Sequence, residues 1–249
     1  LLSAAENGFD KSVLALLQQG ASITQADRRG WTALMLASKN GHVKTVDVLL
    51  KDKAFSNKQI DAQNEYGDTA LMIASNAGQA AVVKRLLQAG ADVHRKNKQD
   101  WTALMFAASK GHLSIVGGLI FSRAKIDARN RMDETPLMFA AAGGHDGAAA
   151  LLLESGAQVD RSNNKGETAL LESSFWGHVS VVRLLIERGA SMDIRDGIGC
   201  PPLVWAAAAG NLDVMDLLLD GGAAVDATTS SGETSLMRAC LWGKAQAAR

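Results

Sequence analysis

Histidine is the residue type whose regular spacing first suggests chemistry in this chain. Four of the five histidines follow a glycine, at His42, His112, His145 and His178, and the last three are 33 residues apart. Imidazole is a common metal ligand, but zinc needs its donors about 2 Å away. One histidine per structural unit would place successive imidazoles about 10 Å apart, the usual helix packing distance. We therefore predict no metal or other cofactor, and a hydrogen bond from each histidine that bridges neighbouring turns.

Other reactive side chains give no catalytic pattern. Cys240 aligns with small core positions such as Ala108, which predicts a buried, inert thiol, whereas Cys200 falls at a loop tip and could be open to modification. The pair Asp133-Glu134 falls in a predicted turn, where solvated acids are ordinary. The sequence contains no glycine-rich phosphate loop after a strand and no Gly-x-Ser-x-Gly motif. We predict that the chain is not an enzyme.

Composition excludes several classes of protein. The chain has 249 residues, of which 47% are hydrophobic, with 26 Lys+Arg balanced by 26 Asp+Glu. A net charge of zero argues against coating of nucleic acid by bulk electrostatics. Two cysteines cannot form a disulfide framework, and no apolar run reaches the roughly 18–20 residues of a membrane span. We expect an intracellular, cytoplasmic monomer that does not insert into membranes.

A tetrapeptide of the type Thr-Ala-Leu-Met recurs along the whole chain. Its copies begin 33 residues apart except for one interval of 37, whose four extra residues we place at Phe55, Ser56, Asn57 and Lys58. A constant period of this length indicates a repeat protein. The copies begin at Thr32, Thr69, Thr102, Thr135, Thr168, Pro201 and Thr234.

Each repeat is predicted to contain a helix, a turn, a second helix and an extended finger. Thr32 suits a helix N-cap, and Pro136 suits the first helical position, where the missing N–H has no cost. Gly41 ends the first helix, and apolar residues at helical spacing, such as Val46 and Leu49, mark the second. One such unit cannot bury its own apolar face, so neighbours must stack. We predict an all-α array over residues 1–249, with units near 1–28, 29–65, 66–98, 99–131, 132–164, 165–197, 198–230 and 231–249.

The period, the Thr-Pro-Leu-like core and the recurring Gly-His and Gly-Ala pairs resemble the ankyrin repeat family. The resemblance implies a helix-turn-helix solenoid with β-hairpin-like finger loops. It also implies a concave face of inner helices and finger tips on which a partner protein binds. Where the family usually has histidine after Thr-Pro-Leu, this chain has methionine or another apolar residue. Both ends fall inside a repeat, from which we expect a segment of a longer protein.

The positions that vary between repeats carry the information about a partner. Aromatic and other large apolar side chains at these positions are predicted to be exposed, and with neighbouring cations they form the candidate partner-binding set. This predicted surface also includes Ile198 and Trp242, while Trp205 is expected to pack inside the array. The candidate set comprises Arg28, Arg29, Trp31, Lys39, Tyr66, Lys98, Trp101, Lys110, Arg131, Met132, Phe175 and Trp176.

Charge is distributed unevenly along the chain. Residues 22–131 hold 17 Lys/Arg and 9 Asp/Glu, whereas residues 132–249 hold 8 and 15. Lys96 and Arg129 are equivalent positions, as are Lys98 and Arg131, which predicts a stack of four cations. The basic half could attract an acidic partner, although a solvated charged face is the more ordinary interpretation.

Three functions remain open from the sequence. The first is a non-catalytic scaffold that binds a protein on its concave face. The second is binding of nucleic acid or an anionic ligand by the basic, aromatic first half, which the balanced charge disfavours. The third is a passive spacer within a larger protein.

One segment of the array is predicted to be weak. The outer helix near residues 114–119 contains Gly117 and Gly118, each costing about 1 kcal/mol relative to alanine. Arg123 also stands where other repeats have a terminating glycine. We expect this helix to fray before its neighbours.

Overall fold

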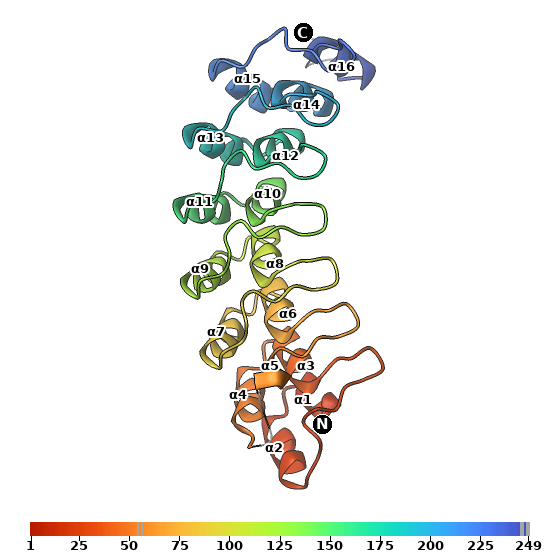
Figure 1. Cartoon of the computed structure of the whole chain (residues 1–249), viewed down its shortest axis with the longest axis vertical. Coiled ribbons are helices and arrows are strands. Elements are labelled where there is room, and N and C mark those ends of the chain that lie inside the picture. Colours follow the sequence, from red (N-terminus) through yellow and green to blue (C-terminus); the bar gives the residue numbers. More distant parts are fainter. Residues whose placement is uncertain (54, 56, 245–246, 248–249) are drawn as a thin grey trace. The chain divides into compact units, whose positions relative to one another are not determined.

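The computed structural model describes residues 1–53, 55, 57–244 and 247, and it contains helices joined by turns and loops (Figure 1). The described helices group into two compact units. Unit 1 is Leu1–Lys125 and unit 2 is Ile126–Arg249. Within each unit the helices follow the predicted all-α helix-turn-helix repeat, which is confirmed.

In unit 1, inner helices pack side by side in one row and outer helices pack in a second row behind them (Figure 1). The outer helices turn an apolar face, including Val46, Leu49, Val82 and Leu86, toward the inner row and bury it. The inner helices are α1 (Leu2–Glu6), α3 (Ala33–Lys39), α6 (Ala70–Asn76) and α8 (Ala103–Ser109), and the outer ones are α2 (Asp10–Gln18), α4 (Val43–Lys51), α7 (Ala80–Gln88) and α9 (Leu113–Phe121).

Unit 2 repeats this two-row arrangement. The inner helices are α10 (Pro136–Ala142), α12 (Ala169–Trp176), α14 (Pro202–Ala209) and α16 (Ser235–Leu241), and the outer ones are α11 (Asp146–Glu154), α13 (Val179–Glu187) and α15 (Leu212–Asp220). The long interval between repeats belongs to unit 1 and contains the short helix α5 (Asn57–Ile60). Of the four residues predicted to be inserted there, Ser56 lies outside the described residues.

The inner helices begin as the sequence predicts. The hydroxyl of Thr32 accepts the backbone N–H of Met35, and the other N-cap threonines make the same bond. Proline occupies the first turn of α10 and α14. Methionine at the position where the family usually has histidine has a role of its own: in two repeats, the Met105 and Met138 sulfurs accept the N–H of the capping threonine at 3.5 and 3.4 Å. The substitution therefore leaves that cap hydrogen-bonded.

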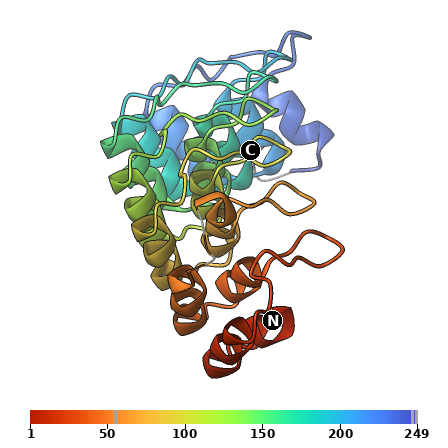
Figure 2. The same ribbon diagram turned by 60° about the horizontal axis from the view of Figure 1, so that its bottom comes forward.

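The finger loops are tight turns organised by one polar side chain each, which is exposed in the first finger (Asp27) and buried in the following ones. In a typical finger, Asn64 Oδ1 accepts the backbone N–H groups of Tyr66 and Asp68, both at 2.9 Å. Neighbouring fingers in a unit are also joined through their backbones, as where the Lys98 N–H donates to the Tyr66 carbonyl at 3.0 Å. Extended pairing in the described residues is limited to isolated bridges, such as Ala26 with Thr32. Figure 2 shows the loops of unit 1 projecting beyond its inner helices.

Three of the four regularly spaced histidines make the predicted bridging hydrogen bond, and it joins neighbouring repeats. The rings of His42, His112 and His178 lie 2.9, 3.3 and 2.9 Å from the backbone carbonyl at the end of the preceding inner helix. Gln79 and Asn211 occupy the equivalent position in other repeats and donate to the same carbonyls. This position therefore needs a side chain that can hydrogen-bond a carbonyl, and an amide meets that need as well as an imidazole does.

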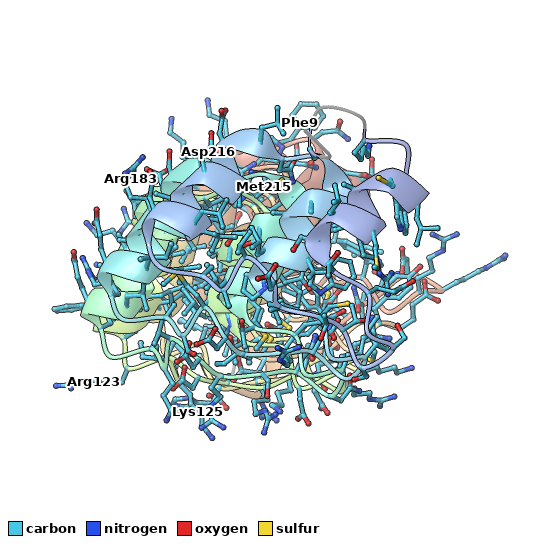
Figure 3. All side chains as sticks on the ribbon, turned by 90° about the horizontal axis from the view of Figure 1, so that it is seen from above. Phe9, Arg123, Lys125, Arg183, Met215 and Asp216 are labelled. Carbon is cyan, nitrogen blue, oxygen red and sulfur yellow. The ribbon has the colours of Figure 1, made fainter. Side chains whose placement is uncertain are left out.

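Helix α9 carries the two glycines predicted to weaken it. It is nonetheless a continuous helix over Leu113–Phe121, and Arg123, two residues beyond its end, has a positive φ of 67°. Non-glycine residues rarely adopt this left-handed conformation, which costs about 1–2 kcal/mol. The Arg123 side chain extends from the ribbon into solvent, as does that of Lys125 (Figure 3). The termination of α9 is therefore strained, although its helical hydrogen bonding is intact.

Gly118→Ala should stabilise unit 1 by about 0.5–1 kcal/mol, because alanine has the higher helix propensity. A Cβ added at Gly118 meets no atom within 4 Å, so the gain is not offset by a clash. Urea unfolding of the variant and the parent chain measures the change. An unchanged or lower midpoint would contradict the prediction.

Candidate functional site

A depression of about 260 Å³ lies on the inner-helix side of unit 1, and we call it the unit 1 niche. The finger tips contribute Trp31, Tyr66 and Asp68, and the inner helices contribute the remaining residues. Its lining thus combines aromatic, apolar and charged side chains. The helix residues are Lys39, Met72, Ile73, Asn76, Ala77 and Phe106.

A second depression, of about 150 Å³, lies on the inner-helix side of unit 2, and we call it the unit 2 niche. Helix α12 supplies most of its lining, and the following helix α14 supplies Trp205. Three aromatic rings and two carboxylates dominate its chemistry. The lining residues are Glu167, Leu171, Glu172, Phe175, Trp176 and Trp205.

The two niches occupy the same place in the repeat. Every lining residue of the unit 2 niche stands 99 residues, or three periods, after a lining residue of the unit 1 niche. Glu172 thus corresponds to Ile73, Trp176 to Ala77 and Trp205 to Phe106. The repeat backbone therefore creates the depression, and the variable side chains decide what it can bind.

In the unit 1 niche the aromatic rings already have partners within the chain. The Lys39 ammonium lies 5.5 Å from the centre of the Trp31 ring, a cation–π contact. The rings of Trp101 and Phe106 pack with their centres 4.9 Å apart. Of the three Trp and Tyr residues predicted in this unit, Tyr66 keeps the most accessible ring, with 48% of the residue exposed.

In the unit 2 niche the three aromatic rings form one cluster. Phe175 meets Trp176 and Trp205 edge to face, with centres 5.1 and 5.0 Å away. The Trp205 indole N–H donates to Asp196 at 3.0 Å, and that of Trp176 donates to Glu172 at 3.3 Å. These bonds fix both indoles, yet Trp176 remains 58% exposed. The cluster is thus ordered and open to solvent.

Burial is the main reason that the pKa of Glu172 is raised above its ordinary value of 4.5. The negative charges of Glu167 and Glu134 raise that pKa further, while the Trp176 hydrogen bond and Lys165 oppose the rise. Glu172 forms no ion pair with any described residue. The niche therefore holds a carboxylate whose negative charge is disfavoured in the isolated chain.

Glu172→Gln should raise thermal stability at pH 7 by no more than a few degrees, and the gain should vanish near pH 4. The folded chain binds the Glu172 proton more tightly than the unfolded chain does, so wild-type stability falls as pH rises from 4.5 through the raised pKa. Glutamine does not titrate and lacks that loss. Melting temperatures of both proteins from pH 4 to pH 8 measure the gap. A gap that stays constant with pH would contradict this assignment.

The predicted partner-binding residues are unequally exposed in the structure. Tyr66, Met132 and Trp176 are exposed, as are Ile198 and Trp242 outside that set. Trp31, Trp101 and Phe175 were predicted to be exposed and are half-buried, because Lys39, Phe106 and Trp205 cover part of their rings. The predicted cations are all exposed: Arg28, Arg29, Lys39, Lys98, Lys110 and Arg131.

Several of the cations in the basic half have partners within the chain. Arg29 lies 3.7 Å from Glu65, and Arg129 lies 3.2 Å from Asp133 while it also donates to the Ser162 carbonyl. Lys96 and Lys98 belong to unit 1, whereas Arg129 and Arg131 belong to unit 2. The stack of four cations stays a prediction.

Both cysteine predictions are wrong. Cys200 is buried, and burial raises the pKa of its thiol. Cys240 is exposed, because no described helix of a following repeat covers α16. Alignment within a repeat array predicts burial only where a neighbour is present on both sides.

The candidate partner-binding set omitted four residues that shape the niches, namely Ile73, Phe106, Glu172 and Trp205, of which Trp205 was expected to pack inside the array. They stand at one repeat position, 33 residues apart, with Phe139 between Phe106 and Glu172. That position changes from aliphatic to aromatic to acidic, unlike the constant leucine two residues earlier. A repeat position whose residue type varies between constant neighbours was therefore the sequence signal that could have identified these four residues.

Two further searches of the described residues bear on function. No three His, Cys, Asp or Glu side chains among them lie together as a metal site would require. No helix in the described part of the chain has the length and hydropathy needed to cross a bilayer.

Comparison with known proteins identifies the repeat. A stretch of 89 residues is 35% identical to ankyrin repeat and SOCS box protein 3 of Bos taurus, covering 36% of this chain and 17% of that protein. A stretch of 93 residues is 36% identical to the transient receptor potential cation channel subfamily A member 1 homolog of Caenorhabditis elegans, covering 37% and 7%. A stretch of 95 residues is 35% identical to the B-cell lymphoma 3 protein homolog of Mus musculus, covering 38% and 20%.

The matched stretches thus span a fifth or less of each of these relatives. A family model described as ankyrin repeats (3 copies) covers far more of the chain, since it matches residues 1–97, 55–130, 104–196 and 189–249. Together these matches extend from the first residue to the last. The chain belongs to the ankyrin repeat family.

Proposed function

We propose that the chain is a non-catalytic binding module that holds a partner protein on the inner-helix and finger-loop side of its repeats. Ankyrin repeats are a general protein–protein interaction module. The relatives carry names as different as a SOCS box protein and a cation channel homolog, so similar repeats occur in very different whole proteins. The module's role in its own protein is then to recognise a partner.

The observation that carries the proposal is the repeated niche with an exposed aromatic side chain at each copy. Tyrosine and tryptophan dominate the energetics of protein interfaces because they bury a large area at little entropic cost. Tyr66 in unit 1 and Trp176 in unit 2 are such side chains beside a ready-made depression. An ordered chain gains no stability from leaving them in water, so their exposure favours an interface.

Nucleic-acid binding is supported less well by the same observations. A nucleic-acid interface needs open aromatic faces for base stacking and cations free to contact phosphate. Trp31 and Trp101 are half-buried against Lys39 and Phe106, and Arg29 is paired with Glu65. We also propose that the partner is met inside the cell, as predicted from the two free cysteines.

Alanine at Tyr66 or Trp176 should reduce capture of specific partner proteins at least tenfold, because an interface anchor contributes more than about 1.4 kcal/mol. Phe121→Ala is the matched control, since this aromatic residue is 88% exposed but lies on outer helix α9. Each immobilised variant is incubated with cell extract, and bound proteins are quantified by mass spectrometry.

Four outcomes of this experiment decide between the functions. Proteins lost with Tyr66→Ala or Trp176→Ala and kept with Phe121→Ala support the proposal. Identical capture by all variants would indicate a passive spacer, and loss with Phe121→Ala alone would move the interface to the outer helices. Capture that is dominated by nucleic acid and falls steeply with salt would favour the alternative. Circular dichroism of each variant excludes unfolding as the cause.

A further inference from the structure

The unit 2 niche offers aromatic surface to a cation. Phe175 meets its two neighbouring indoles edge to face, so the three rings do not stack on one another. Trp176 is 58% exposed at the edge of the depression. A lysine ammonium or an arginine guanidinium is attracted to an indole face, and more strongly where water is partly excluded.

The same niche holds more negative charge than its one neighbouring lysine balances. Glu167 and Glu172 line it, and Glu134 is close enough to act on Glu172 electrostatically. Glu172 has no ion-pair partner among the described residues. The nearest cation acting on the pair is Lys165, which lies 3.9 Å from Glu167 and is itself largely exposed. A like-charged cluster beside aromatic rings is stabilised by an added positive charge.

The unit 1 niche shows how a cation fits this place in the repeat. There the Lys39 ammonium lies over the Trp31 ring, 5.5 Å from its centre. The residue of unit 2 equivalent to Lys39 is Ala142, which carries no charge. Unit 1 thus supplies a cation at this place from within the chain. In unit 2 the residue equivalent to Trp31 is Glu134, and Lys165 pairs with Glu167, so Glu172 has no ion-pair partner among the described residues.

From this contrast we propose that the unit 2 niche binds a lysine or arginine side chain of the partner protein, an inference that rests on the proposed function. The aliphatic stem of that side chain packs against Phe175 and Trp176. Its charged head lies between the Trp176 ring and the carboxylates of Glu167 and Glu172. The partner segment that enters unit 2 is therefore basic, which differs from the acidic partner predicted for the first half.

A titration with synthetic peptides tests the inference directly. Four Gly-Ser dodecapeptides are used that differ only at one central residue, which is arginine, lysine, citrulline or norleucine. The chain contains five tryptophans, so its indole N–H groups give a small set of NMR signals that single Trp→Phe variants assign. The arginine and lysine peptides should shift the Trp176 and Trp205 signals. The Kd values obtained from these shifts should be at least fivefold lower than those of the citrulline and norleucine peptides.

Variants of the full chain provide the second arm. Glu172→Gln should raise the Kd of the arginine peptide about tenfold, whereas Glu187→Gln, which removes the same charge from outer helix α13, should leave it within twofold. Three results would each overturn the inference. All four peptides could bind equally, or the two variants could have equal effects. The third is a Trp176 signal that does not shift at 10 mM peptide, about the concentration at which a site with a millimolar Kd is saturated.

The outcomes for the inference and for the proposed function are separable. If partner capture depends on Trp176 but the arginine and citrulline peptides bind alike, the binding module stands and the cationic ligand is wrong. If the arginine peptide binds selectively but no captured protein depends on Tyr66 or Trp176, the niche chemistry stands and the proposed function fails.

Discussion

Gly67→Ala is expected to destabilise unit 1 by about 3 kcal/mol, the largest effect on stability that we predict for a single methyl group. Gly67 lies at a finger tip with a φ of +81°, in the left-handed region where alanine costs about 1–2 kcal/mol. Its added Cβ would also lie 2.7 Å from the backbone nitrogen of Lys98 in the next finger. A contact this short with backbone cannot be relieved by a side-chain rotation.

The close approach exists because adjacent fingers share a backbone hydrogen bond. The Lys98 N–H donates to the Tyr66 carbonyl at 3.0 Å, and Gly67 follows that carbonyl directly. A methyl group would push the two fingers apart and break this bond. The damage would therefore reach both repeats and the position of Tyr66 in the unit 1 niche.

Gly90→Ala is the control for this prediction. Gly90 has a similar φ of +88°, but a Cβ there meets no atom within 4 Å. Gly90→Ala should therefore lower the free energy of unfolding by only the cost of the left-handed backbone conformation, about 1–2 kcal/mol. Urea unfolding gives both free energies, and hydrogen exchange of the Lys98 amide should accelerate in Gly67→Ala alone. Equal destabilisation by the two variants would show that finger contact contributes nothing.

Asp196→Ala is expected to cost about 2–4 kcal/mol and to disorganise the unit 2 niche. Asp196 is buried at a finger turn, where one carboxylate oxygen accepts the N–H groups of Ile198 and Cys200 at 3.0 and 2.7 Å. The other oxygen accepts the Trp205 indole N–H at 3.0 Å. Alanine would leave three donors without this acceptor, and buried donors are costly to leave unpaired.

Asp196→Asn separates the turn from the niche. Asparagine occupies the equivalent position at residues 64, 97, 130 and 163 and accepts the same pair of backbone N–H groups there. The turn should therefore survive in Asp196→Asn, but its amide NH2 would face the Trp205 indole N–H, donor against donor. We expect a loss of about 1 kcal/mol, with Trp205 released.

Unfolding in urea and the NMR signal of the Trp205 indole report the two effects of Asp196 independently. Asp196→Ala should lower the midpoint and broaden or shift the indole signal, whereas Asp196→Asn should mainly change the signal. A Trp205 signal that is unaffected in both variants would show that Asp196 does not position this wall of the niche.

Much of the architecture follows from the sequence because it is set by local spacing. The Thr caps, the terminating glycines and the apolar spacing of the outer helices act within one repeat, and each was assigned correctly from residue type. The histidine bridges were also predictable, because a fixed period places equivalent residues of neighbouring repeats side by side.

The exposure of individual side chains could not be assigned in the same way. Trp31 is half-buried because Lys39, eight residues later, comes to lie over its ring, and Phe175 is half-buried because Trp205 of the next repeat lies against it. Cys240 is exposed for a similar reason, since no described helix of a following repeat covers α16. Burial of a variable residue depends on the size of other variable residues, which no period records.

The amino-acid order by itself determined the repeat, its helices, its turns and the family, because caps, glycines and periodicity act over a few residues along the chain. Only the tertiary structure decided that Glu172, Trp176 and Trp205 line one depression and that its counterpart in unit 1 contains a lysine over a tryptophan. The physical reason is that a binding depression forms between repeats. Its shape and charge come from side chains that meet only after the repeats have stacked.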